Sequence, residues 1–131
     1  AVNHVYGYAL GLDMTRRDLQ GEMKKMGRPW EIGKAFEKSA PMAPIIPASD
    51  LGHPVQGLID LKVNGVLKQK GDLNQMIWKT ADMISYLSTY YELAAGDLIM
   101  SGTPAGVGPI VKGDIMTGSI AGMGELLVTV V

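Results

Sequence analysis

The stretch GLIDLKVNGVLKQKG, residues 57–71, contains the clearest local structure in the chain. Two strand-like runs, residues 58–63 and 66–69, flank the dipeptide Asn64-Gly65. This dipeptide favours a type I′ turn because both of its residues readily adopt a left-handed backbone conformation. The stretch therefore predicts an antiparallel β-hairpin, the unit from which antiparallel sheets are commonly built.

Beyond this hairpin, the chain predicts one helix and a second pair of strands. Asp72, with Gln75 three residues later, has the pattern of a capped helix start. Apolar residues at helical spacing continue that helix to about Tyr90. Residues 114–120 and 125–131 are strand-like runs joined by the glycine-rich sequence AGMG, so they predict two more strands.

The N-terminal part of the chain predicts a strand followed by a helix. Residues 5–14 are mostly apolar and predict a strand that is buried on both faces. Thr15 has the character of an N-cap, and Asp18 three residues later completes a capping-box pattern. We expect the helix to run from about Arg16 to Met26, where Gly27 ends it.

The remaining segments predict extended or irregular structure. Three prolines in residues 40–50 exclude a regular helix and favour an edge segment or covering loop. Residues 94–102 predict a turn and a short buried strand, and residues 103–109 a loop. The whole pattern is that of an α+β domain with antiparallel hairpins and two helices. Because strands do not alternate with helices, a doubly wound sheet is disfavoured.

Composition narrows the class of protein. The 131 residues suffice for one domain with a modest core, and the net charge of −1 without a basic stripe argues against nucleic acid. There are no cysteines, which excludes disulfides and thiolate metal sites and fits a reducing compartment. No apolar run approaches the ~18 residues of a membrane span. We therefore expect a cytoplasmic protein without a nucleic-acid or membrane partner.

Three groups of residues could carry chemistry. Asp13 ends the first predicted strand beside a helix start, where a carboxylate suits a hard cation such as Mg²⁺, Mn²⁺ or Ca²⁺; alternatively it caps the helix or pairs with a neighbouring arginine. Arg16 or Arg17 and Gln20 share a helix face that could hold a carboxylate, or could simply be solvated. Lys34 lies among small residues and could stabilise an oxyanion, or could be an ordinary surface lysine.

Three further features give weaker indications of a site. Lys38 offers the same chemistry as Lys34 but has more polar neighbours. The loop Ser101–Pro109 could form an anion-binding nest of backbone N–H groups or a tight structural turn. His4 and His53 have no partner at ligand spacing, so catalysis by either is not expected.

Five segments, in this order, resemble the catalytic domain of the fumarylacetoacetate hydrolase family and cover nearly the whole chain. They are GYALGLDMTRRDLQ (7–20), GRPWEIGKAFEKSAP (27–41), LKVNGVLKQKGDLNQMIW (61–78), AAGDLIMSGTPAGVGP (94–109) and GDIMTGSIAGMGELLVTVV (113–131). Within the family, the chain looks most similar to bacterial acylpyruvate hydrolases.

The resemblance implies layered, mainly antiparallel sheets that form a roll, usually in a homodimer, and a divalent cation held by three carboxylates. Asp13 matches the last carboxylate. The resemblance places the other two in a Glu-x-Glu motif upstream, with a lid segment whose His–Glu pair activates water. It therefore implies that residues 1–131 are a catalytic domain lacking its N-terminal portion, and inactive alone.

The resemblance also implies roles for the other candidates. Arg17 and Gln20 match positions that line the substrate pocket, and Arg16 matches a position that differs in some relatives. Lys34 matches a lysine that contacts the substrate oxygens. Gly102 and Thr103 match the loop that closes over the substrate carboxylate.

The activity implied is metal-dependent hydrolysis of the C–C bond of a 2,4-diketo acid, with fumarylpyruvate, which yields fumarate and pyruvate, as the first candidate substrate. The cation would polarise the 2-keto group, and the cation and Lys34 would stabilise the pyruvate enolate that leaves. The same site could instead decarboxylate oxaloacetate or isomerise a hydroxy-dienedioate. A non-catalytic binding domain on this scaffold is a further alternative, which the joint presence of Asp13, Gln20 and Lys34 disfavours.

Overall fold

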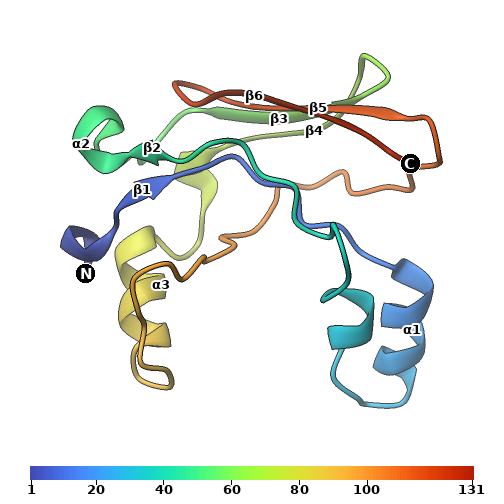
Figure 1. Cartoon of the computed structure of the whole chain (residues 1–131), viewed down its shortest axis with the longest axis horizontal. Helices are drawn as coiled ribbons and strands as arrows, with labels where there is room; N and C mark the ends of the chain where they lie inside the picture. Colours follow the sequence, from blue (N-terminus) through green and yellow to red (C-terminus); the bar gives the residue numbers. More distant parts are fainter.

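The computed structural model describes all of residues 1–131, and its centre is a four-stranded antiparallel sheet (Figure 1). The strands lie in the order β4-β3-β5-β6, and all three neighbouring pairs are antiparallel. Their bounds are β3 Leu58–Val63, β4 Val66–Asp72, β5 Ile115–Ile120 and β6 Gly124–Thr129. Both predicted hairpins are therefore confirmed, with ends that differ by three residues or fewer.

The turn of the first hairpin has the predicted backbone. Asn64 and Gly65 have φ angles of 51° and 79°, the left-handed values that a type I′ turn requires. The Asn64 side chain also ties this turn to the start of β5. It donates to the carboxylate of Asp114 at 2.8 Å and accepts from the backbone N–H of Ile115 at 2.9 Å.

Asp114 makes this junction sensitive to acid. The backbone N–H of Val111 and the amide of Asn64 donate to its carboxylate, and they lower its pKa. A pKa that is lower in the folded than in the unfolded protein stabilises the fold above the unfolded value, and this stabilisation is lost as pH falls through the folded value. We therefore expect Asp114→Ala to lower the urea midpoint at pH 7, and the difference from wild type to shrink at an acidic pH below the ordinary aspartate value of 3.8. An unchanged difference at both pH values would contradict this role.

The two faces of the sheet differ in polarity. Gly118 in β5 leaves room for Leu10, whose methyl carbons lie 3.4 and 3.6 Å from the place of a Cβ on that glycine. The buried apolar side chains surround this contact and are Leu10, Val63, Met116 and Ile120. On the opposite face, Ser119 donates to the carboxylate of Asp60. The sheet thus has one apolar face, covered by the N-terminal part of the chain.

That covering segment is an irregular antiparallel ribbon rather than the predicted strand. Only β1, Gly7–Tyr8, pairs regularly with β2, Ile46–Pro47, and a single bridge joins Gly11 to Met42. Isolated backbone hydrogen bonds continue the pairing to Met14. The prediction of a strand over residues 5–14 is therefore confirmed only for Gly7–Tyr8. The predicted burial on both faces is wrong, because Leu10 is the one buried residue in this segment.

The first helix is confirmed, but its predicted cap is wrong. Helix α1 spans Arg17–Lys25, and its N-cap position is Arg16, which makes no side-chain capping hydrogen bond. The Thr15 hydroxyl accepts a hydrogen bond from Lys34 instead of capping the helix. A tertiary partner has therefore replaced the local capping box that the sequence predicts.

The second predicted helix is divided into two pieces. Asp72 and Gln75 form the predicted capping box, but the helix that they cap is a single 3-10 turn, η3 Leu73–Gln75. Lys79 stabilises the end of this 3-10 turn, because its ammonium group donates to the backbone carbonyl groups of residues 74 and 76. The longer helix, α3, spans Thr80–Leu87.

The other short elements lie at the edges of the molecule. They are η1 Val2–His4, η2 Glu31–Gly33 and α2 Ala48–Leu51. The prediction of a short buried strand within 94–102 is wrong, because Leu98 and Met100 are 62% and 45% exposed and no strand pairs with this segment. No helix combines the length and apolar character that crossing a membrane requires.

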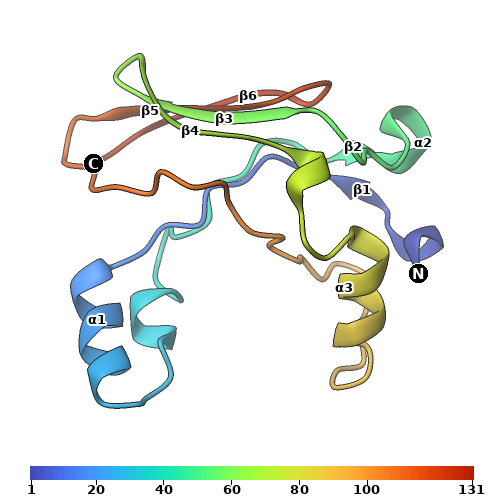
Figure 2. The ribbon, with the colours of Figure 1, turned by 180° about the vertical axis from the view of Figure 1, so that it is seen from behind.

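The arrangement is open. Figures 1 and 2 show the four-stranded sheet as one layer, with α1 and α3 projecting from the same side of it at opposite ends. The accessible surface is 9150 Å², against about 6,700 Å² for a compact monomer of this mass. Many large apolar side chains therefore remain exposed in this chain.

Candidate active site

Asp13 and Lys34 form an ion pair at the point where the ribbon meets α1. Lys34 Nζ lies 2.5 Å from Asp13 Oδ1 and donates to Thr15 Oγ1 at 2.9 Å. The two charged side chains are 48% and 31% exposed for Asp13 and Lys34 respectively, so the pair faces an accessible surface. A carboxylate and an ammonium group, 21 positions apart in sequence, thus share one small site.

Gly33 brings these two groups together. A Cβ on Gly33 would lie 2.9 Å from the backbone nitrogen of Gln20 and 3.1 Å from the carbonyl oxygen of Arg16, so only glycine permits this approach. The carbonyl of Gly33 also accepts a hydrogen bond from the backbone N–H of Arg16 at 2.9 Å. As a result, η2 packs against the first turn of α1 and carries Lys34 to Asp13.

This close approach leads to a stability prediction with an internal control. Gly33→Ala should destabilise the full-length protein by about 1–3 kcal/mol, because the added methyl group meets backbone atoms that cannot move aside cheaply. Gly21→Ala lies in α1 with open space around it, and should stabilise by roughly 0.5–1 kcal/mol. Urea unfolding of both variants measures the contrast. Equal effects of the two substitutions would show that the packing of η2 on α1 is loose.

The helix residues of the site are arranged as one interacting pair and one separate arginine. Arg17 donates to the side-chain oxygen of Gln20 at 2.7 Å, which is the i, i+3 relation expected from the sequence. The guanidinium of Arg16 lies 4.4 Å from the ring centre of Phe36, a cation–π contact. Arg16 is thus engaged by Phe36, and Arg17 and Gln20 form a polar pair on the first turn of α1, the helix that follows Asp13 in the chain.

The structure does not bring the Gly102–Thr103 loop into contact with these groups. The Thr103 hydroxyl accepts a hydrogen bond from Gln69 in β4. Met100, just before this loop, does contact the ribbon. Its methyl carbon lies 3.6 Å from the place of a Cβ on Gly11. The loop therefore begins beside the ribbon that bears Asp13, as Figure 1 also shows, and then runs along the sheet.

The residues present fit one ligand of a hard-cation site. The chain has no group of three or more His, Cys, Asp or Glu side chains that could hold a metal ion. Asp13 is a half-exposed carboxylate whose charge partner, Lys34, is also accessible, so its oxygen can be reached by a cation. One carboxylate does not make such a site by itself, as the sequence already indicated.

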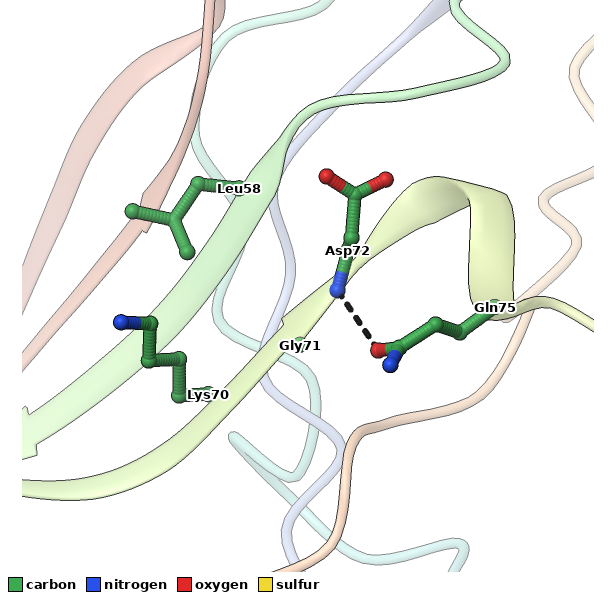
Figure 3. A pocket seen from close by; sticks show the side chains of 5 residues that line it. All are labelled: Leu58, Lys70, Gly71, Asp72 and Gln75. Atoms are coloured by element: carbon green, nitrogen blue, oxygen red, sulfur yellow. Dashed lines mark hydrogen bonds between the residues drawn. The ribbon is translucent and has the colours of Figure 1, made fainter.

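A separate hollow lies at the edge of the sheet and is lined by Leu58, Lys70, Gly71, Asp72 and Gln75 (Figure 3). Two of its three polar side chains, those of Asp72 and Gln75, are already engaged in hydrogen bonds. Gln75 accepts from the backbone N–H of Asp72, and Asp72 accepts from two backbone N–H groups. These contacts stabilise the turn at the end of β4. Lys70 is the one polar side chain of the hollow without a partner, and a single lysine gives no reason to place catalysis there.

His53 has a partner that the sequence did not predict. Its Nδ1 lies 2.8 Å from the hydroxyl oxygen of Tyr8, and the two rings pack edge to face. Burial raises the pKa of Tyr8, against a smaller lowering by its hydrogen bond with Thr80. Tyr8 lies in β1 and His53 follows α2, and the hydrogen bond of Tyr8 with Thr80 joins the ribbon to the start of α3.

Comparison with known proteins identifies the family. A family model for the C-terminal domain of fumarylacetoacetate (FAA) hydrolase matches residues 1–131. The chain belongs to this family. The order of motifs that suggested the FAA hydrolase family, and the α+β fold of antiparallel sheets with few helices, are thereby confirmed.

Three relatives show where the chain lies within the FAA hydrolase family. Fumarylpyruvate hydrolase of a Ralstonia species is 47% identical over 126 residues, which cover 96% of this chain and 65% of that protein. Oxaloacetate tautomerase YcgM of Escherichia coli is 46% identical over 114 residues, covering 86% of this chain and 52% of that protein. Fumarylpyruvate hydrolase of Pseudomonas aeruginosa, solved in complex with Mn²⁺ and pyruvate, is 56% identical with a TM-score of 0.98.

The matches leave part of each relative uncovered. This chain spans all of its own length but 56% of the Pseudomonas aeruginosa structure. In sequence it spans about half to two thirds of the two curated relatives.

Proposed function

We propose that the full-length protein hydrolyses the C–C bond of a 2,4-diketo acid, with fumarylpyruvate as the first candidate substrate. The observation that carries the proposal is the ion pair of Asp13 with Lys34, which places a carboxylate able to bind a cation next to a positive charge. The similarity to two fumarylpyruvate hydrolases, one of them solved with Mn²⁺ and pyruvate, supports the choice of substrate.

Lys34 would act on the oxygen where negative charge develops. Addition of water to the C4 carbonyl and cleavage of the C3–C4 bond leave an electron pair on the pyruvate fragment, as an enolate at the C2 oxygen. An ammonium group held beside that oxygen stabilises the enolate more than the neutral ketone, and therefore lowers the barrier. Protonation at C3 then gives pyruvate, while C4 becomes the carboxyl carbon of fumarate.

The other candidates would bind the two ends of the substrate. Gln20 and the Gly102–Thr103 loop would hold the 2-oxo carboxylate end. The far carboxylate of fumarylpyruvate needs a cation, and we assign it to Arg17, because the guanidinium of Arg16 already lies on Phe36. Arg17 is bonded only to the neutral amide of Gln20, which a carboxylate can replace.

Asp13 would hold a divalent cation, Mg²⁺, Mn²⁺ or Ca²⁺, together with ligands from a part of the protein outside residues 1–131. When bound, such an ion supplies Lewis-acid polarisation of the 2-keto oxygen. The ion pair with Lys34 would hold the Asp13 carboxylate in one orientation. We propose that the missing ligands and a water-activating His–Glu pair lie in an N-terminal portion.

Oxaloacetate tautomerisation is the second candidate, and the 46% identity to YcgM favours it over the decarboxylation and isomerisation that the sequence suggested. Both oxaloacetate and a diketo acid present a 2-oxo carboxylate, and their enols or enolates carry charge on the same oxygen. Asp13 and Lys34 serve either reaction, so these residues do not distinguish the two substrates.

A substrate panel separates the candidates. The full-length protein with Mn²⁺ is assayed with fumarylpyruvate and acetylpyruvate, followed by loss of diketo absorbance, and with oxaloacetate, followed by keto–enol exchange. We expect the highest kcat/KM for fumarylpyruvate. Turnover of oxaloacetate alone would overturn the hydrolase proposal in favour of the tautomerase. No turnover of any substrate, with folding and Mn²⁺ binding intact, would favour a binding domain.

We also propose that the enzyme is a homodimer, as the family resemblance implies. Many large apolar side chains of this chain are exposed, including those of Ile77, Tyr86 and Tyr90. Such a surface is typical of one that another protein surface covers, either a second copy of the chain or a further part of the same protein.

A further inference from the structure

We propose that Gln69 is a positioning residue that orients the Thr103 hydroxyl as a hydrogen-bond donor to the 2-oxo carboxylate. The inference rests on the proposed function only for the role of Thr103. The geometry of Gln69 stands by itself: its side chain is 8% exposed and is the one buried polar or charged side chain of the chain.

A β-bulge aims Gln69 at the loop. In the β3–β4 ladder, Leu61 pairs with Gln69 and Lys62 pairs with Leu67, so Lys68 is the extra residue. Without the bulge, Leu67 and Gln69 would share a face by simple alternation. The bulge instead places Gln69 on the apolar face of the sheet, where a polar side chain requires a partner.

The partners are two consecutive residues of the loop. The Gln69 amide nitrogen donates to Thr103 Oγ1 at 2.8 Å and to the carbonyl oxygen of Pro104 at 2.6 Å. Because a carbonyl oxygen only accepts, the NH₂ group of the amide must face the loop. Thr103 Oγ1 therefore accepts, and its own hydroxyl hydrogen remains available to donate to a ligand.

Two glycines, Gly71 in β4 and Gly106 in the loop, allow the loop to approach β4 closely on either side of Gln69. A Cβ on Gly106 would lie 2.1 Å from the carbonyl oxygen of the bulged Lys68. A Cβ on Gly71 would lie 3.1 Å from the ring of Pro104. The loop is thus docked by close backbone approach, while Gln69 supplies the directional contact that fixes the hydroxyl.

The competing interpretation is that Gln69 is only a satisfied buried polar residue that holds the sheet together. In that case its removal would change stability without a specific effect on ligand binding. If it acts through Thr103, its removal should weaken binding of a 2-oxo carboxylate, and this effect should disappear when the Thr103 hydroxyl is already absent.

The test uses the full-length protein and pyruvate as the probe. Gln69→Met keeps the length of the side chain without its donors, and Gln69→Leu is a second variant of this kind. Thr103→Val removes the hydroxyl, and Gln56→Met makes the same chemical change at an exposed glutamine. Pyruvate binding to the Mn²⁺-loaded protein is measured by calorimetry for each variant and for the Gln69→Met, Thr103→Val double variant, with thermal unfolding as the check on folding.

We expect Gln69→Met and Thr103→Val each to weaken pyruvate binding about tenfold, with Mn²⁺ affinity and Gln56→Met unchanged. The double variant should lose far less than the product of the two. Full additivity, unchanged binding in Gln69→Met, or failure of both Gln69 variants to fold would overturn the proposal. The pyruvate probe also separates the Gln69 proposal from the proposed reaction. Pyruvate binding without turnover of a diketo acid would contradict the reaction but leave the Gln69 result valid. Absence of pyruvate binding in the wild type would contradict both proposals.

Discussion

Replacing Asp13 by alanine in the full-length protein should abolish metal-dependent turnover while the fold survives. Loss of residues that only support a metal ligand costs about 10–100-fold, so loss of a ligand itself should lower kcat/KM by more than about 100-fold. Asp13 is half exposed and its ion pair with Lys34 is accessible to water, so the cost in stability should stay below about 1 kcal/mol. Steady-state kinetics across a Mn²⁺ titration, with urea unfolding, measures both quantities.

Asp18→Ala provides the matched control for this experiment. Asp18 is an exposed carboxylate in the first turn of α1, five positions after Asp13, and forms no ion pair. It should leave kcat/KM and the Mn²⁺ dependence unchanged. Wild-type turnover in Asp13→Ala at saturating Mn²⁺ would remove Asp13 from the site, and equal losses in both variants would point to a general effect of charge on α1.

Lys34→Met should reduce kcat by roughly 10²–10³-fold, the range measured when one preorganised donor to a developing oxyanion is removed. KM should change much less, since the ammonium group favours the enolate-like transition state over the bound ketone. Single-turnover rates at saturating substrate, for fumarylpyruvate or for whichever substrate is active in the panel, separate the chemical step from product release.

Lys38→Met is the control for the lysine. Lys38 lies four positions later, is exposed, and has a left-handed backbone at φ 59° that methionine must also adopt, so the backbone cost is similar. It should retain wild-type kcat. A Lys34→Met enzyme with normal kcat and a raised KM would mean that the ammonium group only binds the substrate and does not stabilise the transition state.

The sheet could be predicted because its signals are local. Asn64-Gly65 fixes one turn through its own backbone preference, and the glycine-rich connection after Ile120 fixes the other. The capping pair of Asp72 and Gln75 also forms as predicted. In each case the atoms that decide the conformation lie within a few residues of one another.

Other parts could not be read from local sequence, because distant partners decide them. Lys34 engages the hydroxyl of Thr15, so the local cap pattern does not form. Lys79 closes the turn after residue 76 and divides the predicted helix into two. The bulge at Lys68 has no clear signature in the sequence, and without it alternation places Gln69 on the wrong face.

The candidate site also contains one contact that local sequence predicts and one that depends on distant residues. The i, i+3 relation of Arg17 and Gln20 follows from helix geometry and is present. The ion pair of Asp13 with Lys34 depends on the approach of Gly33 to α1, which only the folded chain reveals. The family resemblance supplied the roles of these residues, which the local pattern alone left open, and those roles remain predictions.

A crystal structure of the full-length protein with Mn²⁺ and oxalate tests the proposed site most directly, because oxalate is a planar mimic of the pyruvate enolate. We predict an anomalous manganese peak bonded to an Asp13 carboxylate oxygen, with Lys34 Nζ within hydrogen-bonding distance of an oxalate oxygen. Manganese bound elsewhere, or oxalate bound beyond the reach of Lys34, would contradict the assignment of Asp13 and Lys34 to one metal–enolate site.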